Sequence, residues 1–271
     1  MKRQATGKAP AGDSKYPSIF QQLISLNILV TNDDGIHSEG ITLLADALEE
    51  AGNVYVVAPD RERSATGHSL SLHHPLRVDE VSKNRYAIDG TPTDCVNLAV
   101  NGLLDVRPDI VVSGINKGAN MGDDITYSGT VSAAMEGTLL GIPSIAMSLT
   151  TKSGFIFDTA IDAALRVTRR VVEKGLPKDT LLNVNVPNIK KEALQGWKIT
   201  RQGKRIYGDA VVEKLDPRGR KYFWIGGDSL GFEHIEDSDF QAVSENFISV
   251  TPLHLDLTNY SSMEELRPWS F

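Results

Sequence analysis

The sequence predicts an α/β fold built on a mostly parallel β-sheet. The first observation behind this prediction is an alternation, between about residues 26 and 150, of short apolar runs with segments whose apolar residues recur at helical spacing. Strands that alternate with helices in this way form βαβ units, whose strands lie parallel. The second observation is the composition, because 271 residues with 41% hydrophobic and 23% charged side chains are typical of a folded domain with a sizeable core.

Each expected strand is a short apolar run, rich in β-branched residues, that ends at a turn residue. The first is LNILV, residues 26–30, and an acidic pair, Asp33 and Asp34, begins three residues after it ends. The run PDIVVSGIN, residues 108–116, predicts a strand that passes through a turn into a loop. The other strands, including a short hairpin, are expected at residues 54–59, 72–81, 85–90, 142–149 and 181–187.

The expected helices carry start and stop signals. Residues 38–53 have Ser38 as a candidate N-cap and Gly52 as a stop. Residues 91–104 open with a capping box formed by Thr91 and Asp94, with proline at the first helical position. The remaining helices are expected at residues 128–141 and 157–176.

The pattern changes after Pro187. Residues 197–227 alternate polar and apolar side chains on both sides of DPRG, where Asp216 to Gly219 fit a type I turn. This pattern predicts a long β-hairpin, and because an isolated hairpin is marginally stable, we expect it to pack on another subunit. Residues 247–258 are expected to return to the main sheet as a late strand.

Three regions are therefore expected: a flexible tail at 1–25, a core at 26–190 and a C-terminal elaboration at 191–271. The tail is basic and lacks the apolar stretch of a secretory signal, and a mitochondrial-type transit peptide is the alternative. No apolar run is long enough to span a membrane. The only cysteine, Cys95, allows no internal disulfide and no cysteine-based zinc site, so a cytoplasmic location is expected. A net charge of −7 argues against a partner such as duplex nucleic acid.

Polar loops follow three of the expected strands: TNDDG, PDRERSATGHS and SGINKGANMGDDITYSGT. Ligands of open parallel sheets bind beyond the carboxyl ends of the strands, so these loops should converge on one site. Asp33 and Asp34 repel each other in an empty turn, although Asp-Gly is also common in ordinary turns. With Ser64 and Asn116 they offer the oxygen ligands of a hard divalent cation such as Mg²⁺, Mn²⁺ or Ca²⁺.

The third loop also predicts a phosphate site. Its glycines, Gly118 among them, let the backbone approach an anion closely, although the P-loop pattern is missing. Ser128, Gly129 and Thr130 open a helix, whose unpaired N–H groups attract anions. The alternative role for Ser128 is ordinary helix capping.

Other polar side chains lie close to these loops. His37 and His68 are the candidates for a general acid, with a surface or structural role as the alternative for each. Asp123 and Asp124 are expected to order their loop, and Cys95 is expected to be buried packing.

The stretches ILVTNDDGI, APDRERSATGHS, GTPTDCV, SGINKGANMGDDITYSGTVSAAMEG and SVTPLHLDLT resemble, in order, the motifs of the stationary-phase survival protein SurE family. The resemblance covers about residues 28–256. It implies a Rossmann-like fold with helices on both faces of the sheet and a C-terminal elaboration through which two or four copies assemble. It also implies a metal-dependent nucleotidase that removes phosphate from nucleoside 5′- and 3′-monophosphates, with some members attacking short polyphosphate. Lys117 departs from the smaller residue of some members, which leaves the substrate preference open.

The resemblance implies that Asp33, Asp34, Ser64 and Asn116 are the metal ligands. It also implies that each subunit binds one Mg²⁺ or Mn²⁺ ion. Asp33, Asp34 and Asn116 are then the expected catalytic residues, and the expected phosphate contacts are Asn116, Gly118, Ser128, Gly129 and Thr130. Two other functions remain open at this stage. One is a metal-dependent glycosyltransferase, and the other is a non-catalytic module that senses nucleotide or metal.

Overall fold

The computed structural model describes residues 26–151, 153–207, 211–225 and 229–270. The tail expected at residues 1–25 lies outside this part of the chain. Within it, none of the helices combines the length and the apolar character needed to cross a bilayer.

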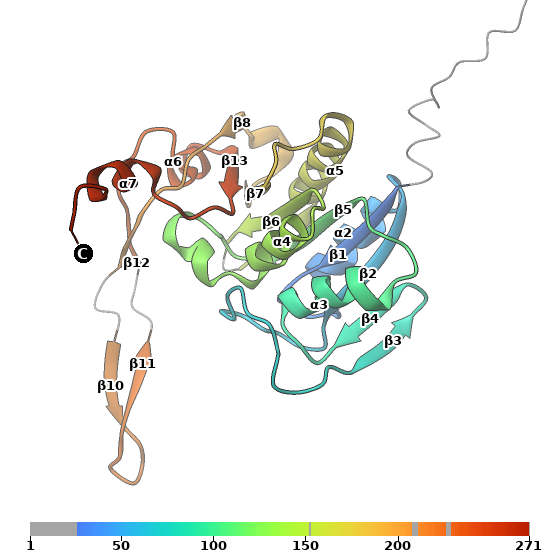
Figure 1. The fold of residues 1–271 in the computed structure, drawn as a ribbon, viewed down its shortest axis with the longest axis horizontal. Coiled ribbons are helices and arrows are strands. Elements are labelled where there is room, and N and C mark those ends of the chain that lie inside the picture. The colour runs from blue at the N-terminus through green and yellow to red at the C-terminus, as the bar shows by residue number, and fades with distance from the viewer. Residues whose placement is uncertain (1–25, 152, 208–210, 226–228, 271) are drawn as a thin grey trace, which may run out of the picture.

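Nine strands form the main sheet, in the order β3-β4-β2-β1-β5-β6-β7-β13-β8 (Figure 1). Neighbouring strands from β4 to β7 pair in parallel, whereas β3 and β13 run antiparallel to β4 and β7. The predicted α/β class and mostly parallel sheet are therefore confirmed. The strands are β1 Asn27–Thr31, β2 Asn53–Pro59, β3 Val78–Ser82, β4 Arg85–Ile88, β5 Ile110–Lys117, β6 Ser144–Thr150, β7 Thr180–Pro187, β8 Gly196–Ile199 and β13 Phe247–His254.

Helices cover both faces of this sheet (Figure 1). Ile28 and Val30 of β1 belong to the apolar cluster beneath α2 and α5, whereas Leu29 belongs to the cluster beneath α3 and α4. Successive strand residues point to opposite faces, so burial on both sides explains why the run LNILV is apolar throughout. The helices are α2 Glu39–Leu48, α3 Pro92–Leu98, α4 Gly129–Leu139 and α5 Phe157–Lys174, with a π-helical turn at Ala99–Leu103 and 3₁₀ turns at Gly122–Tyr127 and Lys191–Ala193.

The helix starts agree with the sequence, and only the side-chain capping of α2 differs. Thr91 and Asp94 form the predicted capping box of α3, and the Ser128 hydroxyl accepts a hydrogen bond from the N–H of Val131 at the start of α4. Ser38 occupies the N-cap position of α2, but its side chain caps no backbone N–H. Its hydroxyl instead accepts a 2.8 Å hydrogen bond from the Asn32 amide, so the serine ties α2 to the end of β1.

Strand β5 corrects one expectation. The segment SGIN was predicted to turn into a loop, but the strand continues to Lys117 with an irregular register against β6 between Ser113 and Asn116. Gly114 permits this irregularity, because its φ is +137° and a Cβ there would lie 2.4 Å from the Met147 carbonyl oxygen. The extra length carries Asn116 to the carboxyl edge of the sheet.

The C-terminal part corrects a second expectation. Residues 197–199 were included in the predicted hairpin, but they belong to β8, which pairs in parallel with the returning strand β13. The hairpin begins later, at β9 Arg205–Tyr207 and β12 Ser229–Phe232, and continues as β10 Val211–Leu215 and β11 Lys221–Ile225. Its turn is closed by the N–H of Gly219, which donates to the Asp216 carbonyl at 2.9 Å. Two short helices that the sequence did not indicate follow, α6 Asp239–Ser244 and α7 Tyr260–Leu266.

Candidate metal and phosphate site

Three loops meet at the carboxyl edge of the sheet, around the acidic pair. Strand β1 lies between β2 and β5 and pairs in parallel with both, so the loops that follow these strands begin side by side. The N–H of Arg63 donates to the Asp33 carbonyl at 2.7 Å, and the N–H of Lys117 donates to the Asp34 carboxylate at 3.2 Å. The convergence that the sequence predicted is therefore made by direct hydrogen bonds between the loops.

Asp33 is buried against the first turn of α4. The Thr130 hydroxyl donates a 2.5 Å hydrogen bond to its Oδ1. A Cβ built on Gly129 would lie 2.7 Å from the Asp33 Cβ, so only glycine allows the helix to approach this closely. The N-terminus of α4, which was expected to bind a phosphate, thus contacts the carboxylate of Asp33. Ser128 caps the helix, as its alternative role predicted.

The surroundings of Asp33 and Asp34 disfavour the ionised form of each carboxyl group relative to the neutral form. Burial raises the pKa of Asp33 to about 6; the Thr130 hydrogen bond opposes this rise and the charge of Asp34 adds to it. Burial also raises the pKa of Asp34, against the hydrogen bond from the Lys117 backbone. Two adjacent carboxylates of this kind gain from a bound cation, which removes their repulsion and compensates for lost water.

Asn116 and Ser64 lie on the loops that contact the pair. The Asn116 amide nitrogen donates to the Gly118 carbonyl at 3.0 Å, and within the described part of the chain its Oδ1 accepts no hydrogen bond. Ser64 is exposed, and its hydroxyl donates to Glu62 at 2.7 Å. The charge of Glu62 contributes to the raised pKa of Asp34, so this loop lies within electrostatic reach of the pair.

The donor set fits a hard divalent cation. Among the described residues, no group of three or more His, Cys, Asp or Glu side chains could hold a metal ion, so a cation at the acidic pair would need other donors. The hydroxyl of Ser64 and the amide oxygen of Asn116 are the donors that the sequence predicted. Beside the pair, the buried Oδ1 of Asn32 has no hydrogen-bond partner in the described structure. Oxygen donors of mixed charge suit Mg²⁺ or Mn²⁺ better than Zn²⁺.

The glycine-rich loop is held by residues that the sequence reading missed. The Asn120 carbonyl accepts hydrogen bonds from the amides of Asn183 and Asn185 on β7, at 2.8 and 2.9 Å. The Asp239 carboxylate accepts the N–H of Gly122 at 2.8 Å. Polar residues in the otherwise apolar run LLNVNVP were the available signal for the first contact. For the second, 117 residues separate the partners, and no local pattern indicates it.

The remaining candidates have distinct surroundings. His37 is exposed, whereas the Nε2 of His68 lies 2.9 Å from the buried carboxylate of Glu136. Asp124 forms a 2.6 Å ion pair with Arg205 at the base of the hairpin, in line with its expected loop-ordering role. Cys95 is fully buried, as predicted, and burial raises the pKa of its thiol.

Comparison with known proteins identifies the family. Residues 28–209 match the model of the family described as Survival protein SurE. The chain belongs to the SurE family. This confirms the resemblance that the sequence motifs predicted, and the matched range contains the acidic pair, Ser64, Asn116 and the start of α4.

SurE relatives match over nearly the whole chain. The 5′-nucleotidase SurE of Geobacter sulfurreducens is 60% identical over 90% of this chain and 94% of its own length. The 5′-nucleotidase SurE of Geobacter metallireducens is 59% identical over 91% of this chain and 98% of its own length. The crystal structure of the SurE protein from Aquifex aeolicus is 46% identical, covers 89% of this chain and 98% of the solved chain, and superposes with a TM-score of 0.81.

Proposed function

We propose that this chain is a hydrolase, a metal-dependent nucleotidase that removes phosphate from nucleoside 5′-monophosphates. The observation that carries the proposal is the meeting of Asp33, Asp34, the β5 edge and the first turn of α4 at one point of the sheet. Membership of the SurE family and the names of the relatives support the same activity.

The proposed metal ligands are Asp33, Asp34, Ser64 and Asn116, which hold one Mg²⁺ or Mn²⁺ ion per subunit. When bound, the ion neutralises phosphate charge and polarises the phosphoryl oxygens or a water molecule. Phosphoryl transfer depends mostly on positioning and charge stabilisation, so a site without a strong protein nucleophile suffices. Asp33, Asp34 and Asn116 are the proposed catalytic residues.

The proposed phosphate contacts are backbone and side-chain groups of the third loop: Asn116, Gly118, Ser128, Gly129 and Thr130. The Thr130 hydroxyl is engaged by Asp33, so its contribution to the site is to orient that carboxylate. The amide nitrogen of Asn116 is engaged by Gly118, which leaves the side-chain oxygen as its ligand atom. The backbone of Gly118, with φ at +148°, is in a conformation that other residues rarely adopt.

Nucleoside 3′-monophosphates and short polyphosphate are the further proposed substrates. We also propose a cytoplasmic location, with neither a membrane nor duplex nucleic acid as a partner. A phosphate-release panel over nucleoside 5′- and 3′-monophosphates and short polyphosphate, with Mg²⁺, Mn²⁺ or EDTA, tests the proposed substrates. Metal-dependent release of inorganic phosphate from a mononucleotide supports the nucleotidase. Transfer of a sugar without phosphate release would indicate the glycosyltransferase, and tight binding without turnover would indicate a sensing module.

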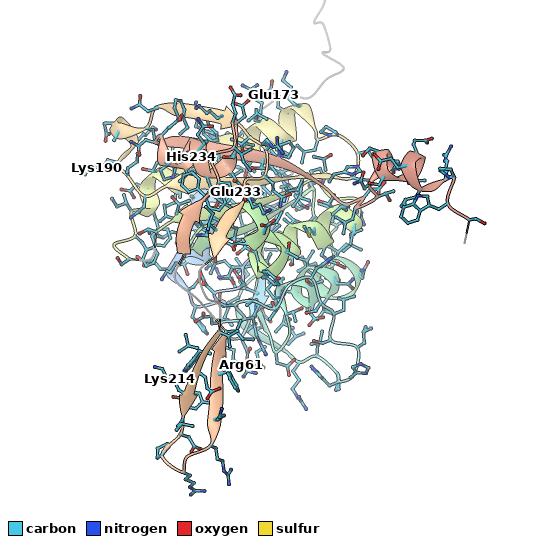
Figure 2. The ribbon with its side chains drawn as sticks, turned by 90° about the vertical axis from the view of Figure 1, so that its left-hand side faces the viewer. Arg61, Glu173, Lys190, Lys214, Glu233 and His234 are labelled. Atoms are coloured by element: carbon cyan, nitrogen blue, oxygen red, sulfur yellow. The ribbon has the colours of Figure 1, made fainter. Side chains whose placement is uncertain are left out.

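The hairpin supports a proposed homodimer or homotetramer. Figure 2 shows the hairpin, which carries Lys214, projecting away from the body of the molecule, where Glu233 and His234 lie. Large apolar side chains on both of its strands are exposed: Val211, Val212, Leu215, Tyr222, Phe223, Trp224 and Ile225. A two-stranded hairpin with such a surface gains stability by packing on another copy of the chain.

A further inference from the structure

Helix α4 carries a buried carboxylate that the proposed chemistry does not use. The Glu136 side chain is 7% exposed, and both of its oxygens are engaged. Oε1 accepts a 2.7 Å hydrogen bond from the Asn97 amide of α3, and Oε2 lies 2.9 Å from Nε2 of His68. One acid thereby joins the helix to the loop that carries Ser64.

His68 lies near the well-anchored end of that loop. The N–H of Gly67 donates to the Tyr127 carbonyl at 3.3 Å, and the Thr91 hydroxyl donates to the Ser69 carbonyl at 2.8 Å. Ser64, four residues before His68, is exposed, and its hydroxyl donates within its own loop, to Glu62. The position of Ser64 therefore depends on anchors on both sides of it, the Arg63 backbone and His68.

The contact between Glu136 and His68 is suited to act as an anchor. Burial alone would raise the pKa of Glu136, but the hydrogen bonds from His68 and Asn97 outweigh it and hold this pKa below its usual range. The acid is thus ionised near neutral pH, and hydrogen bonds to an ionised acceptor are shorter and stronger than neutral ones. Asp94, the other nearby acid, is engaged by the backbone of Thr91 and Ser71.

We propose that Glu136 is a positioning residue, which acts through His68 to hold Ser64 at the metal site. The same helix orients Asp33 through Thr130 at its first turn, so α4 aligns two proposed ligands that come from different loops. This inference rests on the proposed metal site and extends it to Glu136 and His68, which are not among the proposed metal ligands.

Calorimetric titration of Mn²⁺ into the purified chain tests the proposal. Glu136→Gln and His68→Ala should each weaken Mn²⁺ binding by about 10- to 100-fold, as the loss of an outer-shell partner typically does. His68→Gln should restore most of the affinity, because glutamine presents an N–H at a similar reach. Glu173→Gln is the control, since that carboxylate also has two side-chain partners, Arg170 and Lys174, but lies on α5, at the opposite end of the molecule from the hairpin (Figure 2).

A double-variant cycle separates this positioning role from a general loss of structure. With Ser64→Ala in the background, Glu136→Gln should weaken Mn²⁺ binding no further, because the effect passes through Ser64. Equal weakening with and without Ser64, or unchanged affinity in Glu136→Gln, would overturn the proposal. If Glu136→Gln fails to fold, His68→Ala, whose side chain is only partly buried, takes its place in the cycle.

Mn²⁺ binding by the wild type distinguishes a failure of the proposed function from a failure of the positioning role. If the wild-type chain binds no Mn²⁺, the metal site itself is wrong, and hydrogen exchange in the metal-free protein then decides the positioning role. Faster exchange confined to residues 61–69 in Glu136→Gln would support the anchor. Unchanged exchange there would contradict it.

Discussion

The hydroxyl of Thr130 donates a 2.5 Å hydrogen bond to Oδ1 of Asp33, across 97 residues of sequence. The contact joins the first turn of α4 to the end of β1, and it favours the ionised form of a buried acid. Helix α4, whose N-terminus was expected to bind the substrate phosphate, therefore also orients Asp33, a proposed metal ligand.

Thr130→Val should shift the pH dependence of metal binding upward. Without the hydroxyl, the pKa of Asp33 rises further, so a larger fraction of the acid holds a proton near pH 6 and Mn²⁺ must displace it. We expect weaker Mn²⁺ binding near pH 6 and a smaller effect at pH 8, measured by calorimetry at both values. Thr130→Ser keeps the donor and should behave as the wild type; an effect of equal size at both pH values would argue against this role.

Asp33→Asn should stabilise the metal-free protein at high pH. The pKa of Asp33 is about 6 in the fold, against an ordinary value of 3.8, so the fold favours the neutral acid. The stability that neutral Asp33 contributes is present below about pH 4 and is lost as the pH rises through 6. At pH 8 in EDTA we expect the free energy of unfolding of the variant to exceed that of the wild type by roughly 2 to 4 kcal/mol.

Denaturant titrations at pH 4 and pH 8 measure this difference. It should be near zero at the lower pH, where both proteins carry a neutral side chain. Equal stability of the two proteins at pH 8 would show that Asp33 is not destabilised by its burial.

Asp239→Ala should destabilise the fold and loosen the glycine-rich loop. The carboxylate is fully buried and accepts the N–H groups of Gly122, Gly203 and Phe240 at 2.8 to 2.9 Å. Each buried N–H left without a partner costs about 1 to 3 kcal/mol, so we expect a loss of roughly 3 kcal/mol or more in the free energy of unfolding. Asp239→Asn keeps an acceptor and should lose less; equal losses for the two variants would argue against the hydrogen bonds as the cause.

The pair of substitutions Trp224→Lys and Ile225→Lys should separate the proposed oligomer into smaller species. These side chains are 62% and 88% exposed in the single chain, and two charges placed on this surface oppose its burial against another copy. Light scattering after size-exclusion chromatography measures the mass. Leu139→Lys, which adds a charge at an exposed apolar position on α4, is the control. An unchanged mass for the hairpin variant would exclude the hairpin as the contact.

The sequence predicted the local features well, because their signals are local. Burial on both faces makes β1 continuously apolar, and the capping box at Thr91 lies within four residues. Strand β8 was misplaced because its partner β13 lies about 50 residues further along, and an exposed edge strand alternates polar and apolar residues just as a hairpin does. The contacts of Asp33 with Thr130, and of Gly122 with Asp239, are likewise set by the tertiary fold.

The candidate site likewise has features that the local sequence predicted and features that depend on the tertiary fold. The acidic pair and the three polar loops stand out because each follows an apolar run, and the parallel sheet then brings them together. Which donor atoms are free could not be predicted, since this depends on neighbours such as Gly118 for Asn116 and Glu62 for Ser64.

The most direct measurement is the release of inorganic phosphate from a nucleoside 5′-monophosphate by the wild type and by Asp33→Asn, each with Mn²⁺ and with EDTA. We predict release by the wild type that depends on Mn²⁺, and none above background by the variant, although circular dichroism should show the variant folded. Phosphate release by folded Asp33→Asn at the wild-type rate, or wild-type release that persists in EDTA, would contradict a metal-dependent nucleotidase built on the acidic pair.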